Sequence, residues 1–152
     1  MYQTLTPNLM VNDVCQSLNW YRDVLGFELQ LALCPGDKTP LTEVDETQAL
    51  EFAILIRDKV CLMLQERASM ASELPALAGI DIGASQVLYV ELDDVDGHYL
   101  TTRDKVEVVA EPRDQFYGMR EWYCRDCNGY ILCFAQDLRD AQAAIGGKDN
   151  DH

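Results

Sequence analysis

The sequence predicts an α+β fold in which one βαβββ unit occurs twice, over about residues 4–66 and 85–136, with a connector over 67–84. Short segments of the first half recur in the same order in the second half. Two recur at a spacing of 81, a third at 68 and a fourth at 70: Asp13-Val14 with Asp94-Val95, Arg22-Asp23 with Arg103-Asp104, Arg57-Asp58 with Arg125-Asp126, and 60–64 with 130–134. The difference, 81 − 68 = 13, assigns thirteen extra residues to a loop after the first helix.

In the first unit, apolar residues recur at helical spacing after the N-cap candidate Asp13, and Gly26 ends the pattern as a left-handed cap. The helical stripe consists of Val14, Leu18, Tyr21 and Leu25. Alternating apolar residues predict the strands of this unit. The expected elements are a strand over 5–11, a helix over 14–25, a strand over 27–33, a loop over 34–47, and strands over 51–57 and 60–66.

The second unit repeats this order after a short helix in the connector. Asp94 is its N-cap candidate, and Asn128-Gly129 is a strong signal for a hairpin turn. The expected elements are a helix over 70–77, a strand over 85–93, a helix over 95–105, a strand over 106–112 and a hairpin over 117–136. Residues 1–136 then form one domain, and 137–152 add a short helix and a disordered polar tail.

Composition narrows the classes of function. The 152 residues suit one soluble domain, and neither a signal peptide nor a membrane span is found, so we expect a cytoplasmic protein that does not bind membranes. The net charge of −14 argues against nucleic acid, because such binding depends on Lys and Arg. The charge either favours a cationic partner or serves solubility alone.

Cysteine and histidine content limits the chemistry further. Without a secretion signal, the six cysteines are expected to be reduced thiols. Cys124 and Cys127 have zinc-site spacing, but no second Cys-x-x-Cys pair completes four ligands. His98 and His152 are the two histidines, and we expect His98 on the surface of the second helix. A site built from two histidines is therefore not expected.

The motifs of the duplicated unit that carry a family resemblance lie at 11–14, 20–27, 62–66 and 117–129. The unit resembles the vicinal oxygen chelate superfamily over about residues 4–136. Within that superfamily, it is similar to the glyoxalase/bleomycin-resistance group. The resemblance implies an incomplete barrel, or cup, formed by the two halves, and a homodimer. It also places the usual metal ligands of the family at Thr6, Met63, Val87 and Cys133. Hard divalent metals need oxygen and imidazole donors, so we expect no metal and no cofactor of the usual family type.

Alternation along the strands indicates which side chains face the cup. The face that includes the four positions above is mixed, as small-molecule pockets are, whereas the other face is wholly apolar. The candidate ligand-binding residues are Asn8, Met63, Gln65, Tyr89, Glu91, Arg120, Trp122 and Cys133.

Each candidate has a plainer alternative. Glu91 either meets a cationic ligand or lies in water at the rim. Arg120 and Trp122 either clamp a planar ligand or provide wall packing and a surface salt bridge. Cys133 is a nucleophile only beside a base, and otherwise a small buried thiol. The loop over 34–47 is a lid, a dimer arm or disordered.

These expectations converge on a small-molecule binding protein that sequesters an aromatic or cationic compound without metal. One alternative is a lyase, isomerase or dioxygenase with an atypical metal site, for example at Glu66 and Glu91. Another is an interaction module with an empty cup. The residues assign no catalytic role and do not identify the ligand.

Overall fold

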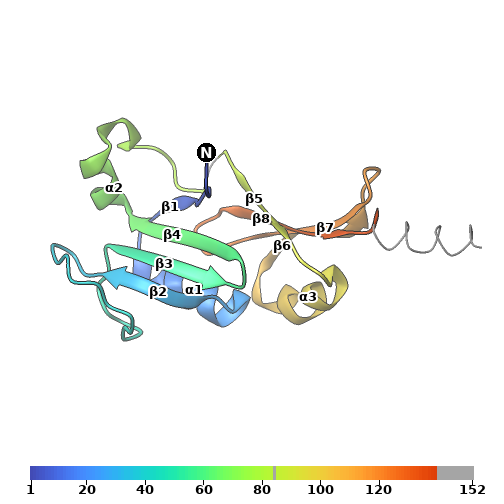
Figure 1. The fold of residues 1–152 in the computed structure, drawn as a ribbon, viewed down its shortest axis with the longest axis horizontal. Helices are drawn as coiled ribbons and strands as arrows, with labels where there is room; N and C mark the ends of the chain where they lie inside the picture. The colour runs from blue at the N-terminus through green and yellow to red at the C-terminus, as the bar shows by residue number, and fades with distance from the viewer. Residues whose placement is uncertain (84, 140–152) are drawn as a thin grey trace, which may run out of the picture. The chain divides into compact units, whose positions relative to one another are not determined.

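The computed structural model describes residues 1–83 and 85–139. These form two compact units, the first containing residues 1–83 with 127–129 and the second residues 85–126 with 130–139. Each βαβββ repeat forms one open four-stranded sheet (Figure 1). The predicted α+β class with two βαβββ repeats is confirmed.

The first repeat forms a sheet of order β1-β4-β3-β2, in which β1 runs parallel to β4 and the other neighbours are antiparallel. A short helix and a 3-10 turn follow in the connector. The elements are β1 (Asn8–Val11), α1 (Val14–Leu25), β2 (Glu28–Leu33), β3 (Phe52–Arg57), β4 (Val60–Glu66), α2 (Arg67–Glu73) and η1 (Pro75–Leu77).

Helix α1 begins and ends where local chemistry predicts. The Asp13 side chain accepts a hydrogen bond from the Gln16 amide at 3.0 Å, which satisfies a free donor of the first turn. Gly26 has a φ of 70°, a left-handed conformation that a residue with a Cβ adopts only under strain. Its apolar stripe, including Leu18 and Tyr21, is buried against β3 and β4. All three predictions for this helix are confirmed.

The second repeat has the same order, β5-β8-β7-β6, with β5 parallel to β8. Asp94 is its N-cap and accepts from the Gly97 amide at 3.0 Å, as predicted. The elements are β5 (Val87–Glu91), α3 (Val95–Thr102), the 3-10 turn η2 (Arg103–Lys105), β6 (Glu107–Asp114), β7 (Met119–Arg125) and β8 (Ile131–Asp137).

The hairpin of the second repeat differs in detail from the prediction. It spans Met119 to Asp137 rather than 117–136, and five residues connect its two seven-residue arms. Gly129 has a positive φ but Asn128 does not, so Asn-Gly is not the centre of a two-residue turn. Instead, Asp126 closes the turn by accepting the Tyr130 amide at 2.9 Å.

The remaining differences lie at the ends of elements. The first strand begins at Asn8 rather than residue 5, and the connector helix begins at Arg67 rather than residue 70. The expected C-terminal helix and tail lie, from residue 140 on, outside the described residues. No helix in the described part of the chain is long and apolar enough to cross a membrane.

Candidate functional site

The open face of the second sheet, the face that does not carry α3, gathers polar and aromatic residues from three strands. Cys133 in β8 lies opposite Tyr89 of β5 on one side and Tyr123 of β7 on the other. Two residues further along β8, Ala135 lies opposite both Glu91 of β5 and Glu121 of β7. Residues directly opposite one another share a face of the sheet, so the pairing places two tyrosines and two glutamates together.

Glu121 is the centre of this group. Its side chain is only 1% exposed, and three tyrosine hydroxyls donate to its carboxylate. Tyr89 donates to Oε2 at 2.5 Å, while Tyr117 and Tyr123 donate to Oε1 at 2.6 and 3.2 Å. The first two bonds have the short length of charge-assisted O–H···O⁻ bonds. Burial of a carboxylate costs several kcal/mol, and these donors offset that cost.

The carboxylate also fixes the state of the tyrosines. Burial and the bond to Glu121 raise the pKa of Tyr89, and the bond to Glu121 raises the pKa of Tyr117 to about 12. The hydrogen bond with the Cys133 thiol, and then burial, raise the pKa of Tyr123. All three phenols therefore remain donors at neutral pH. Because their hydroxyls point inward, the rings of Tyr89 and Tyr117 are fixed while remaining 50% and 43% exposed.

Cys133 lies on the same face of the sheet, and its thiol is in an unreactive environment. The side chain is fully buried, and burial raises the pKa of its thiol to about 11. The thiolate is the reactive form of cysteine, so this environment disfavours a nucleophile at neutral pH. The alternative interpretation, a small buried thiol, fits the structure.

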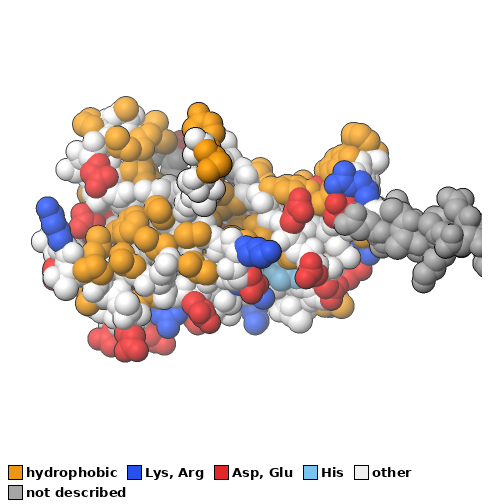
Figure 2. Space-filling view, viewed as in Figure 1, with side chains coloured by type: hydrophobic (Ala, Val, Ile, Leu, Met, Phe, Trp, Pro, Cys, Tyr) orange, Lys and Arg blue, Asp and Glu red, His pale blue; other side chains and the backbone are white. Residues whose placement is uncertain are grey.

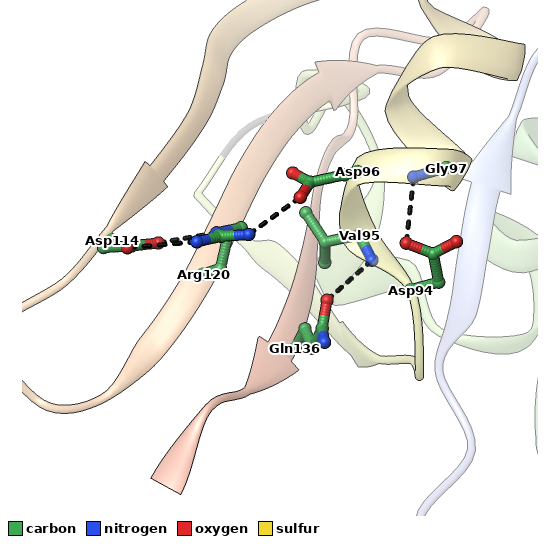
Figure 3. A network of polar contacts seen from close by, with 7 residues as sticks. All are labelled: Asp94, Val95, Asp96, Gly97, Asp114, Arg120 and Gln136. Atoms are coloured by element: carbon green, nitrogen blue, oxygen red, sulfur yellow. Dashed lines mark hydrogen bonds and ion pairs between the residues drawn. The ribbon is translucent and has the colours of Figure 1, made fainter. Parts of the chain in front are cut away.

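Arg120 and Trp122 lie on the other face of β7, toward α3. The Arg120 guanidinium bridges two carboxylates, with Nε 2.7 Å from Asp114 Oδ1 and Nη1 2.7 Å from Asp96 Oδ2 (Figure 3). The hydrogen bond from Arg120 lowers the pKa of Asp114, as expected for a stable ion pair. Arg120 therefore ties β6 to the first turn of α3.

Trp122 is fully buried among aromatic rings of the same unit. Its ring centroid lies 5.5 Å from that of His98, 5.3 Å from Tyr99 and 5.1 Å from Phe134. The expectation that His98 is a surface residue is wrong, because its ring packs in this cluster. Arg120 and Trp122 correspond to the alternative of packing plus an ion pair, and neither lies on the open face of the second sheet.

In the first unit, Asn8 and Gln65 bond to each other rather than projecting freely. Asn8 Nδ2 donates to Gln65 Oε1 at 2.9 Å, and Gln65 Nε2 donates to Ser69 Oγ at 3.0 Å. The rest of this open face is apolar and partly exposed: Leu31, Leu33, Phe52, Ile54, Ile56 and Met63. Figure 2 shows hydrophobic side chains gathered over β2, β3 and β4.

The loop over 34–47 is anchored within the first unit. Leu41 forms a bridge with Ala32, and Cys15 Sγ donates to the Glu46 carbonyl at 3.1 Å. Together with the start of α1, residues 46–50 line a hollow of about 630 Å³. The last two residues of the loop, Glu46 and Thr47, therefore form part of the wall of this hollow.

The positions that correspond to the family's metal ligands do not form a donor set for a hard cation. Thr6 precedes β1, Val87 has no ligand atom, Met63 offers a thioether and Cys133 a buried thiol. Elsewhere among residues 1–83 and 85–139, no three His, Cys, Asp or Glu side chains are grouped to hold a metal ion. The residues present do not fit the metal that the fold implies.

Sequence reasoning missed Glu121, Tyr117 and Tyr123. The match at a spacing of 68 aligns Trp122 with Ile54, which lies opposite Met63. In the structure Tyr123 lies opposite Cys133, so the spacing of these strands is 123 − 54 = 69. A shift by one residue exchanges the two faces of a strand. Counting back from Cys133 across the five-residue turn, with side chains alternating between faces, places Tyr123 and Glu121 on the same face as Cys133.

Comparisons with known proteins agree with this architecture. The family model of the Glyoxalase/Bleomycin resistance protein/Dioxygenase superfamily matches residues 4–134. No curated protein gave a match.

Three solved structures show the same fold. A glyoxalase/bleomycin resistance protein/dioxygenase from Nocardioides is 21% identical with a TM-score of 0.67, over 91% of this chain and 85% of that one. TioX from Micromonospora sp. ML1 is 18% identical with a TM-score of 0.62, over 90% and 100%. The bleomycin-binding protein of Streptomyces verticillus, in complex with copper(II)-bleomycin, is 20% identical with a TM-score of 0.57, over 88% and 95%. With its duplicated repeat and this family match, the chain belongs to the Glyoxalase/Bleomycin resistance protein/Dioxygenase superfamily.

Proposed function

We propose that this protein binds a small aromatic or cationic molecule on the open face of its second sheet, without a metal. The observation that carries the proposal is the buried Glu121 carboxylate held by three tyrosines, two of which leave about half of their side chain exposed. Fixed aromatic rings present contact area at little entropic cost. A buried anion beneath them favours positive charge above them.

Two further features support a cationic or aromatic ligand. The net charge of −14 attracts cations at long range. Glu91 lies on the same face, exposed, two residues beyond Tyr89. A bleomycin-binding protein with this fold provides a precedent for small-molecule binding.

The proposed absence of a metal follows from the donor set at Thr6, Met63, Val87 and Cys133. The enzymatic alternative called for carboxylates such as Glu66 and Glu91. Glu66 instead uses both oxygens to accept the Ala68 and Ser69 amides, each at 3.0 Å, at the start of α2. No specific observation therefore favours the enzyme over the binding protein.

Thermal unfolding with a panel of aromatic amines and cationic glycopeptides tests the proposal. A ligand at a hundred times its Kd is expected to raise Tm by about 5–10 °C, equally with and without EDTA. Tyr89→Ala should abolish the shift. A matched control is Tyr99→Ala, which removes a tyrosine from the α3 side. No shift across the panel would contradict the proposal, and a shift lost in EDTA would contradict its metal-free form.

The homodimer and the cytoplasmic location implied by the sequence stay predictions. Light scattering after size exclusion, with the ligand and without it, measures the first. A monomer of about 17.2 kDa in both conditions would refute the dimer.

A further inference from the structure

The Glu121 cluster contains a negative charge that no ligand can reach. The carboxylate is 1% exposed, and both of its oxygens already accept from tyrosine hydroxyls. A primary ammonium that left water for this face would lose hydrogen bonds to solvent and gain no contact with Glu121. Loss of such bonds without replacement costs free energy. The cluster therefore disfavours a cation that must donate hydrogen bonds.

The electric field of the carboxylate still acts through the rings that enclose it. Tyr89 and Tyr117 are half exposed, and aromatic rings attract cations that lie against them. Hydrogen bonds to an anion polarise the donor, so both phenols become more electron-rich. This arrangement suits a cation that is already weakly hydrated, because such an ion gives up little on leaving water.

A third ring extends the surface. Phe116, in the turn between β6 and β7, is 98% exposed and lies edge-on to Tyr117 with ring centroids 5.1 Å apart. A fully exposed phenylalanine gains free energy when a ligand covers it. The adjoining tyrosines provide the cation subsite and Phe116 an apolar extension.

From these contacts we infer that the ligand carries a cation without hydrogen-bond donors, a quaternary ammonium or a delocalised aromatic cation, joined to an aryl group. The inference rests on the proposed binding function and specifies its ligand class. Glu121 supplies charge without offering the ligand an acceptor, the tyrosines supply the surface, and Glu91, exposed on the same face, adds a second negative charge.

Arg113 provides a second, independent test of whether the bound ligand is positively charged. It lies opposite Glu121 on the edge strand β6, so both project from the same face, and it is exposed. Within the part of the chain that the structure describes, Arg113 forms no ion pair. A bound cation would meet its repulsion, and Arg113→Gln is expected to raise the affinity about threefold.

Calorimetric titration of the intact protein tests the inference with matched probes. Choline, 3,3-dimethylbutanol and ethanolamine compare a quaternary ammonium, its neutral isostere and a primary ammonium, and phenyltrimethylammonium adds the aryl group. We expect choline to bind about tenfold more tightly than either comparison compound, and phenyltrimethylammonium more tightly again. Glu121→Gln should reduce this preference about tenfold, whereas Glu111→Gln, which removes an exposed charge of the same strand pair, should leave it within twofold.

The outcomes separate the inference from the proposed function. If ethanolamine or the neutral isostere binds as well as choline, and Tyr89→Ala weakens both, the site stands and the inference is overturned. If no probe and no member of the wider panel binds, both are overturned. The comparison among probes is made on the unmutated protein, so it holds even if Glu121→Gln fails to fold.

Discussion

The hydrogen bonds of Glu121 predict that its three tyrosines are unequal in their effects on stability. Tyr89 is the single described donor to Oε2, whereas Oε1 has two donors, Tyr117 and Tyr123. Tyr89→Phe leaves one oxygen of a buried carboxylate without a described partner. Tyr123→Phe removes the longest of the three bonds, at 3.2 Å, and leaves Tyr117 in place.

The expected costs follow from these differences. A hydrogen bond to a buried charged group contributes about 1.5–3 kcal/mol, so Tyr89→Phe should lower the free energy of unfolding by about 2 kcal/mol. Tyr123→Phe should cost about 1 kcal/mol, because its bond to Glu121 is long, its acceptor keeps a partner, and its other hydrogen bond is to the neutral Cys133 thiol. In a Glu121→Gln background, where the charge is absent, the cost of Tyr89→Phe should fall below about 1 kcal/mol.

Urea unfolding followed by circular dichroism measures the wild type, the three single variants and the double variant, and the difference of the two Tyr89→Phe costs gives the coupling energy. Tyr99→Phe is the matched control, since this tyrosine packs on Trp122 and does not bond to Glu121. Equal costs for Tyr89→Phe and Tyr123→Phe, or a coupling below about 0.3 kcal/mol, would refute the reasoning.

Three further predictions concern the fold and its pH dependence. Gly26→Ala should destabilise the protein by about 1 kcal/mol in urea unfolding, because Gly26 has a φ of 70° and an added Cβ would lie 3.2 Å from Arg57. Trp122→Ala should cost about 3–5 kcal/mol by the same measurement, since it empties the ring cluster beneath α3. Stability should also fall as pH rises from about 10 toward 12, because the raised pKa of Tyr117, about 12, means that the folded state keeps a proton that the unfolded chain releases near 10. Unfolding as a function of pH should show a smaller fall in Glu121→Gln, where the bond that raises this pKa loses its charge.

The helix ends could be predicted from sequence because their causes are local. Asp13 and Gly26 act within a few residues of the turns they cap, so one stretch of chain contains the whole signal. The repeat could be predicted for a similar reason, since α1 and α3 each follow an aspartate cap at equivalent positions. Predicting these features did not require knowing which helices and strands pack against one another.

The residues on the open face of the second sheet could not be predicted in the same way, because strand faces are set by pairing across a turn. The five residues after Arg125 determine which residues of β7 lie opposite β8, and one residue more or less exchanges Trp122 with Tyr123. The candidates that needed no such count, Tyr89 and Cys133, do lie on one face together. Arg120 and Trp122 depended on the count and lie on the other face.

The corrected register shows that the two repeats have diverged in chemistry while keeping their architecture. At the structural spacings of 81 and 69, Tyr89, Glu121 and Tyr123 correspond to Asn8, Phe52 and Ile54 of the first unit. The first sheet therefore has an apolar open face where the second has a buried carboxylate with its phenols. A buried charge costs stability unless it is fully hydrogen-bonded, and the first repeat does without one. The fold forms in the first repeat without a counterpart of Glu121, and this difference between the repeats supports the proposed binding function of the second sheet.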